Sequence, residues 1–205
     1  PTSKTKEEAA RLAGDLTALN QSRKALTEKG KEEAIRIIET TELKNDRVLV
    51  VYLPDCHESL AGIIAGRIRE KYHRPAFVLT GGEASAKGSG RSIESYSMYE
   101  ELVKCADLMI QFGGHPMAAG LSIEEKNIEE FRRRLNVNCT LTDEELRSKI
   151  VIDVPMPVSY ITKELVEQIS LLEPFGKGNT KPVFAQKNLR VLDHSIIGKN
   201  KNVVK

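Results

Sequence analysis

The feature that most constrains the fold is a strand–helix–strand pattern within residues 47–80. The stretch RVLVVYL, residues 47–53, is a continuous run of apolar and β-branched side chains, which is typical of a strand buried on both faces. Residues 58–72 predict a helix, because apolar side chains recur there at helical spacing: Leu60, Ile64, Ile68 and Tyr72. RPAFVLT, residues 74–80, predicts a second strand. Since a helix connects the two strands, we expect them to pair in parallel.

Further patterns extend this unit into one α/β domain, which we predict over residues 45–140. A glycine- and serine-rich loop, residues 81–93, leads into a short strand. Residues 95–109 and 124–135 have the apolar spacing of helices, and residues 112–123 predict a turn into another strand. The expected fold is therefore α/β, with a mixed β-sheet and flanking helices.

Two further segments flank this domain. Residues 1–44 predict a long connector helix, which glycine at position 30 could break. Residues 149–205 contain short β segments punctuated by Gly, Pro and Asn, which is typical of a small β domain. The segment is short for a complete five-stranded barrel, so we expect a truncated domain. The chain begins at Pro1 and ends within strand-like sequence, which predicts a piece of a longer protein.

Charge and cysteine content narrow the class of protein. Lys and Arg number 31 and Asp and Glu 29, and this net charge of +2 is too mild to predict a nucleic-acid partner by itself. The three cysteines form no CxxC pair, which favours a reduced, intracellular protein over a disulfide framework. The sequence contains no signal peptide and no apolar run long enough to cross a bilayer. We therefore expect a cytoplasmic protein without a membrane partner.

The stretch FGGHPMAAG, residues 112–120, has almost no side-chain bulk around His115. One interpretation is a tight turn that feeds a closely packed strand, with the histidine simply hydrogen-bonded in place. The other is a backbone cleared for a ligand, since glycine permits close approach and oriented N–H groups form anion-binding concavities. Gly113 and Gly114 fit either interpretation, and the stretch alone leaves both open.

A second glycine–polar cluster, GSGRS, occupies residues 88–92. Its arginine can bind a phosphate through two parallel hydrogen bonds, although a flexible loop with a solvated arginine is the alternative. Both clusters lie at strand edges of the same predicted domain. We therefore expect a set of side chains and backbone groups to converge on one phosphate as an anion clamp: Ser89, Gly90, Arg91, Ser92, Gly113, Gly114 and His115.

His57 is a third candidate, because it lies at a strand-to-helix junction and a helix N-terminus favours anions. Its alternative is a capping or core histidine. The sequence has no HExxH motif, no Walker loop and no closely spaced Asp/His cluster. Metal-assisted phosphodiester hydrolysis normally needs such a cluster, so we expect no metal site in this chain. In a phosphodiesterase, the chain would supply the substrate-binding half.

Four segments occur in a fixed order: HESLAGIIAGRIREKYHRPAFVLT, GSGRSI, QFGGHPMAAGLSI and LEPFGKGNTKPVF. Together they closely resemble the RecJ family of single-strand-specific DNA exonucleases, over nearly the whole chain. Residues 45–137 resemble the family's DHH-associated domain, and the first forty resemble the helix that links it to the catalytic domain. Residues 149–205 resemble the start of its oligonucleotide-binding (OB) domain. Gly–Gly–His alone is shared with many DHH-type phosphoesterases and with alanyl-tRNA synthetases, so the order is the more specific signal.

The resemblance implies a 5′-to-3′ exonuclease that hydrolyses single-stranded DNA in DNA repair and recombination. It implies Mn²⁺ or Mg²⁺ held by a catalytic DHH domain that is absent from this chain, so we expect this fragment to bind no metal and to be inactive alone. Single-stranded DNA is the implied partner. A single-strand-binding protein and a helicase are further partners that the family suggests.

The resemblance also implies roles for individual residues. Ser89 and Arg91 match the positions that grip the phosphate at the 5′ end, and His115 matches a catalytic histidine that reaches the scissile phosphate. His57 and Arg67 match further DNA-binding positions of less defined role. One departure is a cysteine at position 56, where an aromatic residue often precedes the histidine, and it affects local packing only.

Two other functions stay open. The first is a module that only recognises RNA, as in alanyl-tRNA synthetases; LEPFGKGN followed by β segments favours the exonuclease over it. The second is a phosphodiesterase for short oligonucleotides or cyclic dinucleotides. Those relatives normally end soon after the Gly–Gly–His domain, whereas this chain continues.

Overall fold

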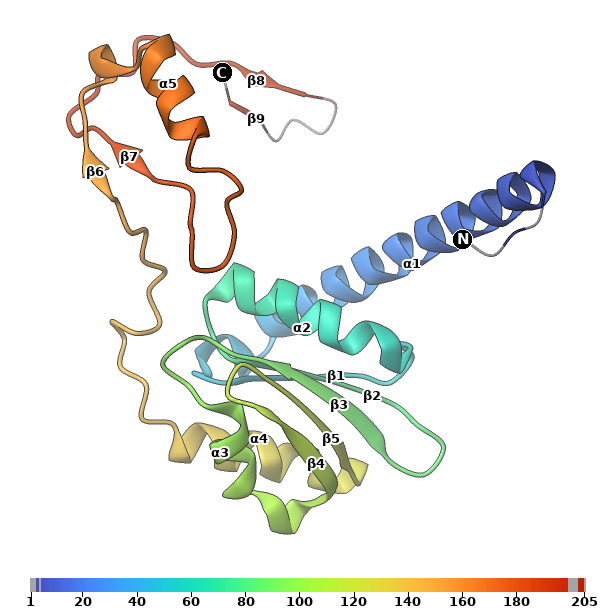
Figure 1. The fold of residues 1–205 in the computed structure, drawn as a ribbon. Helices are drawn as coiled ribbons and strands as arrows, with labels where there is room; N and C mark the ends of the chain where they lie inside the picture. The colour runs from blue at the N-terminus through green and yellow to red at the C-terminus, as the bar shows by residue number, and fades with distance from the viewer. Residues whose placement is uncertain (1–2, 4, 199–202, 205) are drawn as a thin grey trace. The chain divides into compact units, whose positions relative to one another are not determined.

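The computed structural model describes residues 3, 5–198 and 203–204. The chain divides into two compact units, which we call unit 1 (Pro1–Ser148) and unit 2 (Lys149–Lys205) (Figure 1). Within the described residues, no helix combines the length and the apolar character that crossing a membrane requires.

Unit 1 is built on a five-stranded sheet with the order β1-β2-β3-β5-β4. The strands are β1 (Leu49–Leu53), β2 (Ala76–Thr80), β3 (Ala86–Arg91), β4 (Met109–His115) and β5 (Ala118–Ile123). β1 and β2 pair in parallel, as the strand–helix–strand pattern predicts, and the remaining pairs are antiparallel. The predicted mixed sheet with flanking helices is therefore confirmed.

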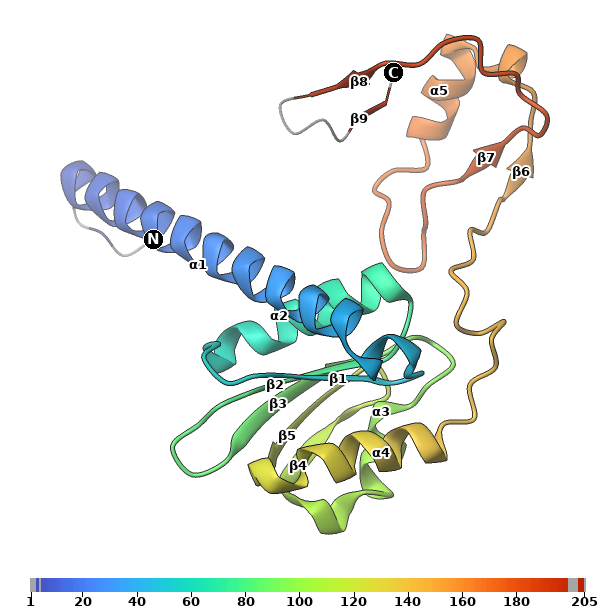
Figure 2. The ribbon, with the colours of Figure 1, turned by 180° about the vertical axis from the view of Figure 1, so that it is seen from behind.

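Helix α2 (Glu58–Tyr72) and the C-terminal end of α1 (Lys6–Thr40) lie on one face of this sheet, and the rest of α1 extends beyond it (Figure 2). Their buried side chains form one core with β1 and β2, which includes Ile38 and Ile64. The predicted break at Gly30 is wrong, because α1 runs through it without interruption. A Cβ on Gly30 would lie 2.6 Å from Ile64 Cδ1, so the glycine lets α1 pack closely against α2.

Helices α3 (Met98–Val103) and α4 (Ile128–Asn138) cover the opposite face, which we call the covered face (Figure 2). They enclose a second core, in which the rings of Phe77 and Phe131 meet edge to face at 5.4 Å. α3 is shorter than the predicted helix over residues 95–109. It tightens into a 3₁₀ turn (Ala106–Leu108), and the chain then enters β4, where pairing with β5 satisfies the backbone.

The two glycine clusters lie in strands rather than loops. GSGR occupies the end of β3, and residues 112–114 lie inside β4, so the turn predicted there is wrong. The reversal comes later, at Pro116 and Met117, between β4 and β5. Because strand residues alternate between the two faces of a sheet, this correction decides which side chains of each cluster lie together.

The described residues of unit 2 form α5 (Lys163–Ser170) and four two-residue strands: β6 (Val154–Pro155), β7 (Phe184–Ala185), β8 (Ile196–Ile197) and β9 (Val203–Val204). β6 pairs with β7 in parallel, and β8 with β9 antiparallel. None of the described residues of unit 2 is buried. These elements therefore form no closed core of their own.

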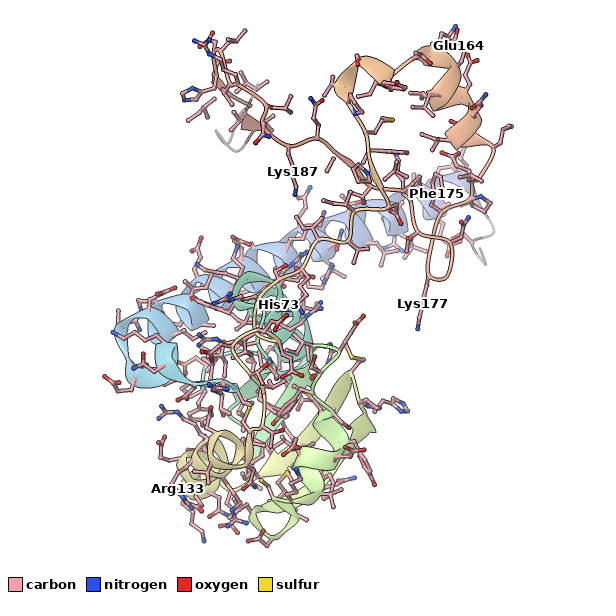
Figure 3. The ribbon with its side chains drawn as sticks, turned by 90° about the vertical axis from the view of Figure 1, so that its left-hand side faces the viewer. His73, Arg133, Glu164, Phe175, Lys177 and Lys187 are labelled. Atoms are coloured by element: carbon pink, nitrogen blue, oxygen red, sulfur yellow. The ribbon has the colours of Figure 1, made fainter. Side chains whose placement is uncertain are left out.

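The loop that follows α5 carries the LEPFGKGN motif and is organised by Asn179. Its Nδ2 donates to the carbonyls of Leu172 (2.8 Å) and Pro174 (3.1 Å), and its backbone pairs with Gly176. Lys177 extends from the tip of this loop (Figure 3). Hydrogen bonds from Asn179, and not a buried apolar core, therefore hold the loop in shape.

Candidate nucleic-acid interface

The sheet face that carries α2 is left open over β5 and β4. Neither buried core includes a side chain from this part of the face, because the core residues of β5 belong to the opposite side and the core beneath α2 includes no strand beyond β2. Strand register aligns two rows across β3, β5 and β4: Ser89–Gly120–Gly113 and Arg91–Ala118–His115. The outer strands of these rows lie two strand spacings apart, about 10 Å. Ser89 and Arg91 of one cluster therefore face the same surface as Gly113 and His115 of the other.

A groove of about 530 Å³ lies on this open surface, and we call it the glycine groove. Most of its lining is polar side chain or bare backbone: Glu58, Ser59, Lys87, Gly88, Gln111, Phe112, Gly113, Gly120, Leu121 and Ser122. Its volume is in the range of small-molecule and nucleotide sites.

Gly113 and Gly120 are cross-strand partners whose missing side chains are not explained by packing. A Cβ on Gly113 would meet nothing within 4 Å, and one on Gly120 would meet only the Gly88 carbonyl at 3.8 Å. Neither residue has the positive φ that requires glycine. Both are exposed, so their absent side chains leave the backbone open to the groove.

Gly90 and Gly114 are explained by packing instead. A Cβ on Gly90 would lie 2.6 Å from Phe77 Cε1, on the side covered by α3. Gly114 has φ +152°, and a Cβ there would lie 2.5 Å from Ala119 Cα. A Cβ on either would collide with neighbouring atoms, so packing by itself accounts for these two glycines, and their role at a phosphate stays a prediction.

Arg91 is held in a defined position beside the groove. Its Nη1 donates to Ser89 Oγ at 3.1 Å and to the Gly90 carbonyl at 2.7 Å. A Cβ on Gly62 of α2 would lie 2.7 Å from Arg91 Nη2, so this glycine makes room for the guanidinium. No carboxylate of the described residues pairs with it, whereas Asp46 pairs with Arg132 at 2.6 Å. Arg91 thus keeps free N–H donors suited to a phosphate.

His115 ends β4 and is exposed. Among the described residues, no group hydrogen-bonds to its ring, so it is not the anchored turn histidine of the simpler interpretation. Register places it across β5 from Arg91. An unengaged imidazole at this edge can donate a hydrogen bond to a ligand in the groove.

Three of the predicted site residues do not join this surface. Ser92 is 1% exposed, and its hydroxyl donates to the Tyr96 carbonyl at 2.5 Å, which corrects the expectation that it faces a phosphate. His57 caps α2, because its Nδ1 accepts from the Ser59 N–H at 3.2 Å. Arg67 is exposed and pairs with Glu70 at 3.0 Å. Neither His57 nor Arg67 lines the glycine groove or lies in a strand of the sheet, whereas Ser89, Arg91 and His115 lie outside the groove lining but in strand rows next to it.

Lys87, Gln111 and Ser122 line the groove and were not predicted from the sequence. Lys87 Nζ donates to Ser122 Oγ at 3.0 Å. The signal was present, since Lys87 precedes Ser89 by two positions and so shares its face of the strand. It could be used only if residues 86–91 were recognised as a strand rather than a loop.

Neither an activated cysteine nor a metal-ligand cluster is found among the described residues. Burial raises the pKa of Cys105 to about 11 and also raises those of Cys56 and Cys139, which keeps the thiols protonated at neutral pH. Over the part of the chain that the structure describes, no group of three His, Cys, Asp or Glu residues could hold a metal ion.

Comparison with known protein families defines the class of both units. Residues 45–139 match the DHHA1 domain, and residues 152–205 match the RecJ OB domain. The first match contains the whole sheet of unit 1 and the glycine groove. The second begins just before β6 and includes the loop organised by Asn179.

Whole-length comparisons agree with these domain matches. The chain is 36% identical to the single-stranded-DNA-specific exonuclease RecJ of Bacillus subtilis, over 97% of this chain and 26% of that protein. It is 35% identical to RecJ of Escherichia coli, over 93% of this chain and 35% of that protein. The crystal structure of Thermus thermophilus RecJ with Mg²⁺ superposes with a TM-score of 0.78 at 28% identity, covering 89% of this chain and 28% of that one. The chain belongs to the RecJ family and spans about a quarter to a third of these curated relatives.

Proposed function

We propose that unit 1 is the substrate-binding part of a 5′-to-3′ exonuclease that hydrolyses single-stranded DNA. The glycine groove and its rim would hold the 5′ end of the strand. The observation that carries this proposal is the open pair Gly113 and Gly120, whose side chains are missing although packing does not require it. The relatives named as single-stranded-DNA-specific exonucleases support the choice of substrate.

The residues beside the groove, Ser89, Arg91 and His115, each take a role that follows from their chemistry. Arg91, oriented by Ser89, binds the terminal 5′ phosphate, because a guanidinium matches phosphate oxygens through parallel hydrogen bonds. His115 lies across β5 from Arg91, beside the open glycines, and donates to the phosphate that is cut, where charge develops in the transition state. Gly113 and Gly120 let the sugar–phosphate backbone lie directly on the sheet.

Hydrolysis in this proposal depends on Mn²⁺ or Mg²⁺ held by residues outside this chain. Two crystal structures of Thermus thermophilus RecJ are complexes with these ions. Since the described residues here contain no ligand cluster, we propose that the chain alone binds DNA without cutting it. The ions would supply charge stabilisation and an activated water from the other side of the substrate.

The proposed organisation has three parts. Residues 1–44 form a connector helix, residues 45–140 the substrate-binding domain, and residues 149–205 a partial OB domain that adds DNA contacts. In the cell this protein would act in the cytoplasm, in DNA repair and recombination. A helicase would expose its substrate, and a single-strand-binding protein would cover it.

The direct test is the preference of the chain for a 5′ phosphate. We expect tighter, salt-sensitive binding to a 5′-phosphorylated single strand than to the same strand with a 5′ hydroxyl. Arg91→Ala should remove this preference, because β3, β5 and β4 carry no other arginine. Arg133→Ala is the matched control, since Arg133 lies on α4 and pairs with Glu130 (Figure 3). An Arg91→Ala protein that keeps the preference would contradict the assignment.

The same assay separates the exonuclease from the two other functions. A module that recognises RNA should bind an RNA strand in preference to DNA. A cyclic-dinucleotide phosphodiesterase should bind its substrate without a free 5′ end. The match of residues 152–205 to the RecJ OB domain favours the exonuclease over both.

A further inference from the structure

A third cross-strand row lies beside the two that form the proposed phosphate site. Register aligns Lys87, Ser122 and Gln111 across β3, β5 and β4, two positions from the row of Ser89, Gly120 and Gly113. Two residues along a strand correspond to about 7 Å. The row therefore lies at the end of the glycine groove that is farther from Arg91.

The side chains of this row have unused hydrogen-bonding capacity. Lys87 Nζ has three N–H donors, and the described structure assigns one of them, to Ser122 Oγ at 3.0 Å. None of the ion pairs among the described residues involves Lys87. Gln111 is exposed on the groove and offers both an N–H₂ donor and a carbonyl acceptor.

The lining of this end favours a nucleobase over a second phosphate. Glu58, at the start of α2, places a carboxylate in the same groove, and a carboxylate repels a phosphate. Gln111 and Ser122 also carry acceptor oxygens, for which a phosphate diester has no donor. The edge of a base presents both donors and acceptors, which this lining can satisfy. The bare backbone of Gly113 and Gly120 leaves room for a flat ring beside it.

We propose that Lys87, Gln111 and Ser122 bind the base of the 5′-terminal nucleotide. This inference rests on the proposed function and adds to it a subsite for the first nucleotide. With the terminal phosphate at Arg91 and the phosphate to be cut at His115, the sugar between them lies over Ala118, beside the row of open glycines, and its base enters the groove. Because a lysine, an amide and a hydroxyl can each reorient, the subsite accepts all four bases and rejects an end without a base.

The test compares three 5′-phosphorylated single strands that differ only in one abasic position. One strand is intact, one lacks the base of the first nucleotide, and one lacks the base of the third. We expect loss of the first base to weaken binding by the unchanged chain about fivefold, the effect of about one hydrogen bond. Loss of the third base should weaken binding of the strand by the unchanged chain much less.

Variants then assign the effect to the row. Gln111→Leu and Lys87→Met should bind the intact strand about as weakly as the unchanged chain binds the strand without its first base, and should no longer distinguish those two strands. Lys104→Met is the matched control, since Lys104 pairs with Glu101 on α3's side of the sheet. It should keep the full discrimination.

Each other outcome overturns a defined statement. If the unchanged chain prefers a 5′ phosphate but ignores the first base, the base subsite is wrong and the proposed function stands. If Lys87→Met weakens the intact and the abasic-end strands equally, Lys87 contacts a phosphate and the inference is wrong. If the chain binds no single strand, the proposed function and this inference fail together.

Discussion

The two faces of the sheet in unit 1 use glycine for opposite purposes. On the covered side, packing requires glycine at positions 90 and 114. A Cβ on Gly90 would collide with Phe77, and a Cβ on Gly114 would collide with the backbone of β5. On the face shared with α2, Gly113 and Gly120 would accept a Cβ into open space. Of two neighbours in sequence, Gly114 is thus required by packing and Gly113 is not. A glycine-rich stretch therefore points to a ligand only where the fold leaves its glycines unexplained.

The largest expected effect is on the covered face. Gly114→Ala should lower the free energy of unfolding by about 3 kcal/mol, because a Cβ collides with Ala118 and Ala119 of β5 and φ is +152°. Urea unfolding of the variant and the unchanged chain measures this loss. An unaltered urea midpoint would show that β4 can shift to relieve the collision. Packing would then not explain Gly114, and the contrast between the two faces would fail.

A second variant loosens the covered face without touching the groove. The Asn136 side chain accepts from the N–H groups of Arg47 (2.9 Å) and Val48 (3.0 Å), and it donates to the Val48 carbonyl (3.0 Å), so it ties α4 to the start of β1. Asn136→Ala should cost about 2 kcal/mol of stability, since it leaves backbone donors unpaired.

The affinity of that variant for 5′-phosphorylated DNA sharpens the comparison. At a temperature where Asn136→Ala is fully folded, we expect unchanged DNA binding, because Asn136 lies outside the glycine groove. Loss of affinity in a folded variant would mean that the groove depends on the position of α4.

The smallest effect is expected at the edge of the open face. His115→Ala should change the free energy of unfolding by less than about 0.5 kcal/mol, since the histidine is exposed and its ring has no partner among the described residues. It should weaken binding of the 5′-phosphorylated strand less than Arg91→Ala does. Isothermal titration of both variants against the same strand makes the comparison, and a larger loss for His115→Ala would exchange the roles of the two residues.

Local sequence patterns predicted the bounds of some helices closely and made one predicted helix too long. The helix predicted over residues 58–72 has those bounds in the structure, because His57 caps its start and His73, with φ 50°, ends it. The helix predicted up to residue 109 stops at Val103, since pairing with β5 outweighs an apolar spacing that continues for only one more turn. The two glycine-rich stretches suggested loops and turns, but both lie in strands. Glycine content indicates how freely the backbone can move, and it does not indicate whether the segment pairs with another strand.

The site could be predicted only as far as the strands were recognised. Ser89 and Arg91 lie on the same face of the sheet as His115, because they occupy alternate positions on β3 and register aligns Arg91 with His115 across β5; their binding roles stay predictions. Ser92 was grouped with them by proximity in sequence, yet alternation turns it toward the covered face. Lys87 shares the face of Ser89 by strand alternation, but its contact with Ser122 depends on strand pairing, which is a tertiary property that no local pattern shows.

The central claim is that the open glycines are kept for a ligand and not for the fold. Gly113→Ala tests it most directly, with unfolding and DNA binding measured on the same preparation. We predict a free energy of unfolding that is unchanged or about 0.5 kcal/mol higher, because alanine reduces the freedom of the unfolded chain, together with a loss of affinity for 5′-phosphorylated single-stranded DNA of at least about tenfold. A variant that binds this DNA as tightly as the unchanged chain would contradict the claim.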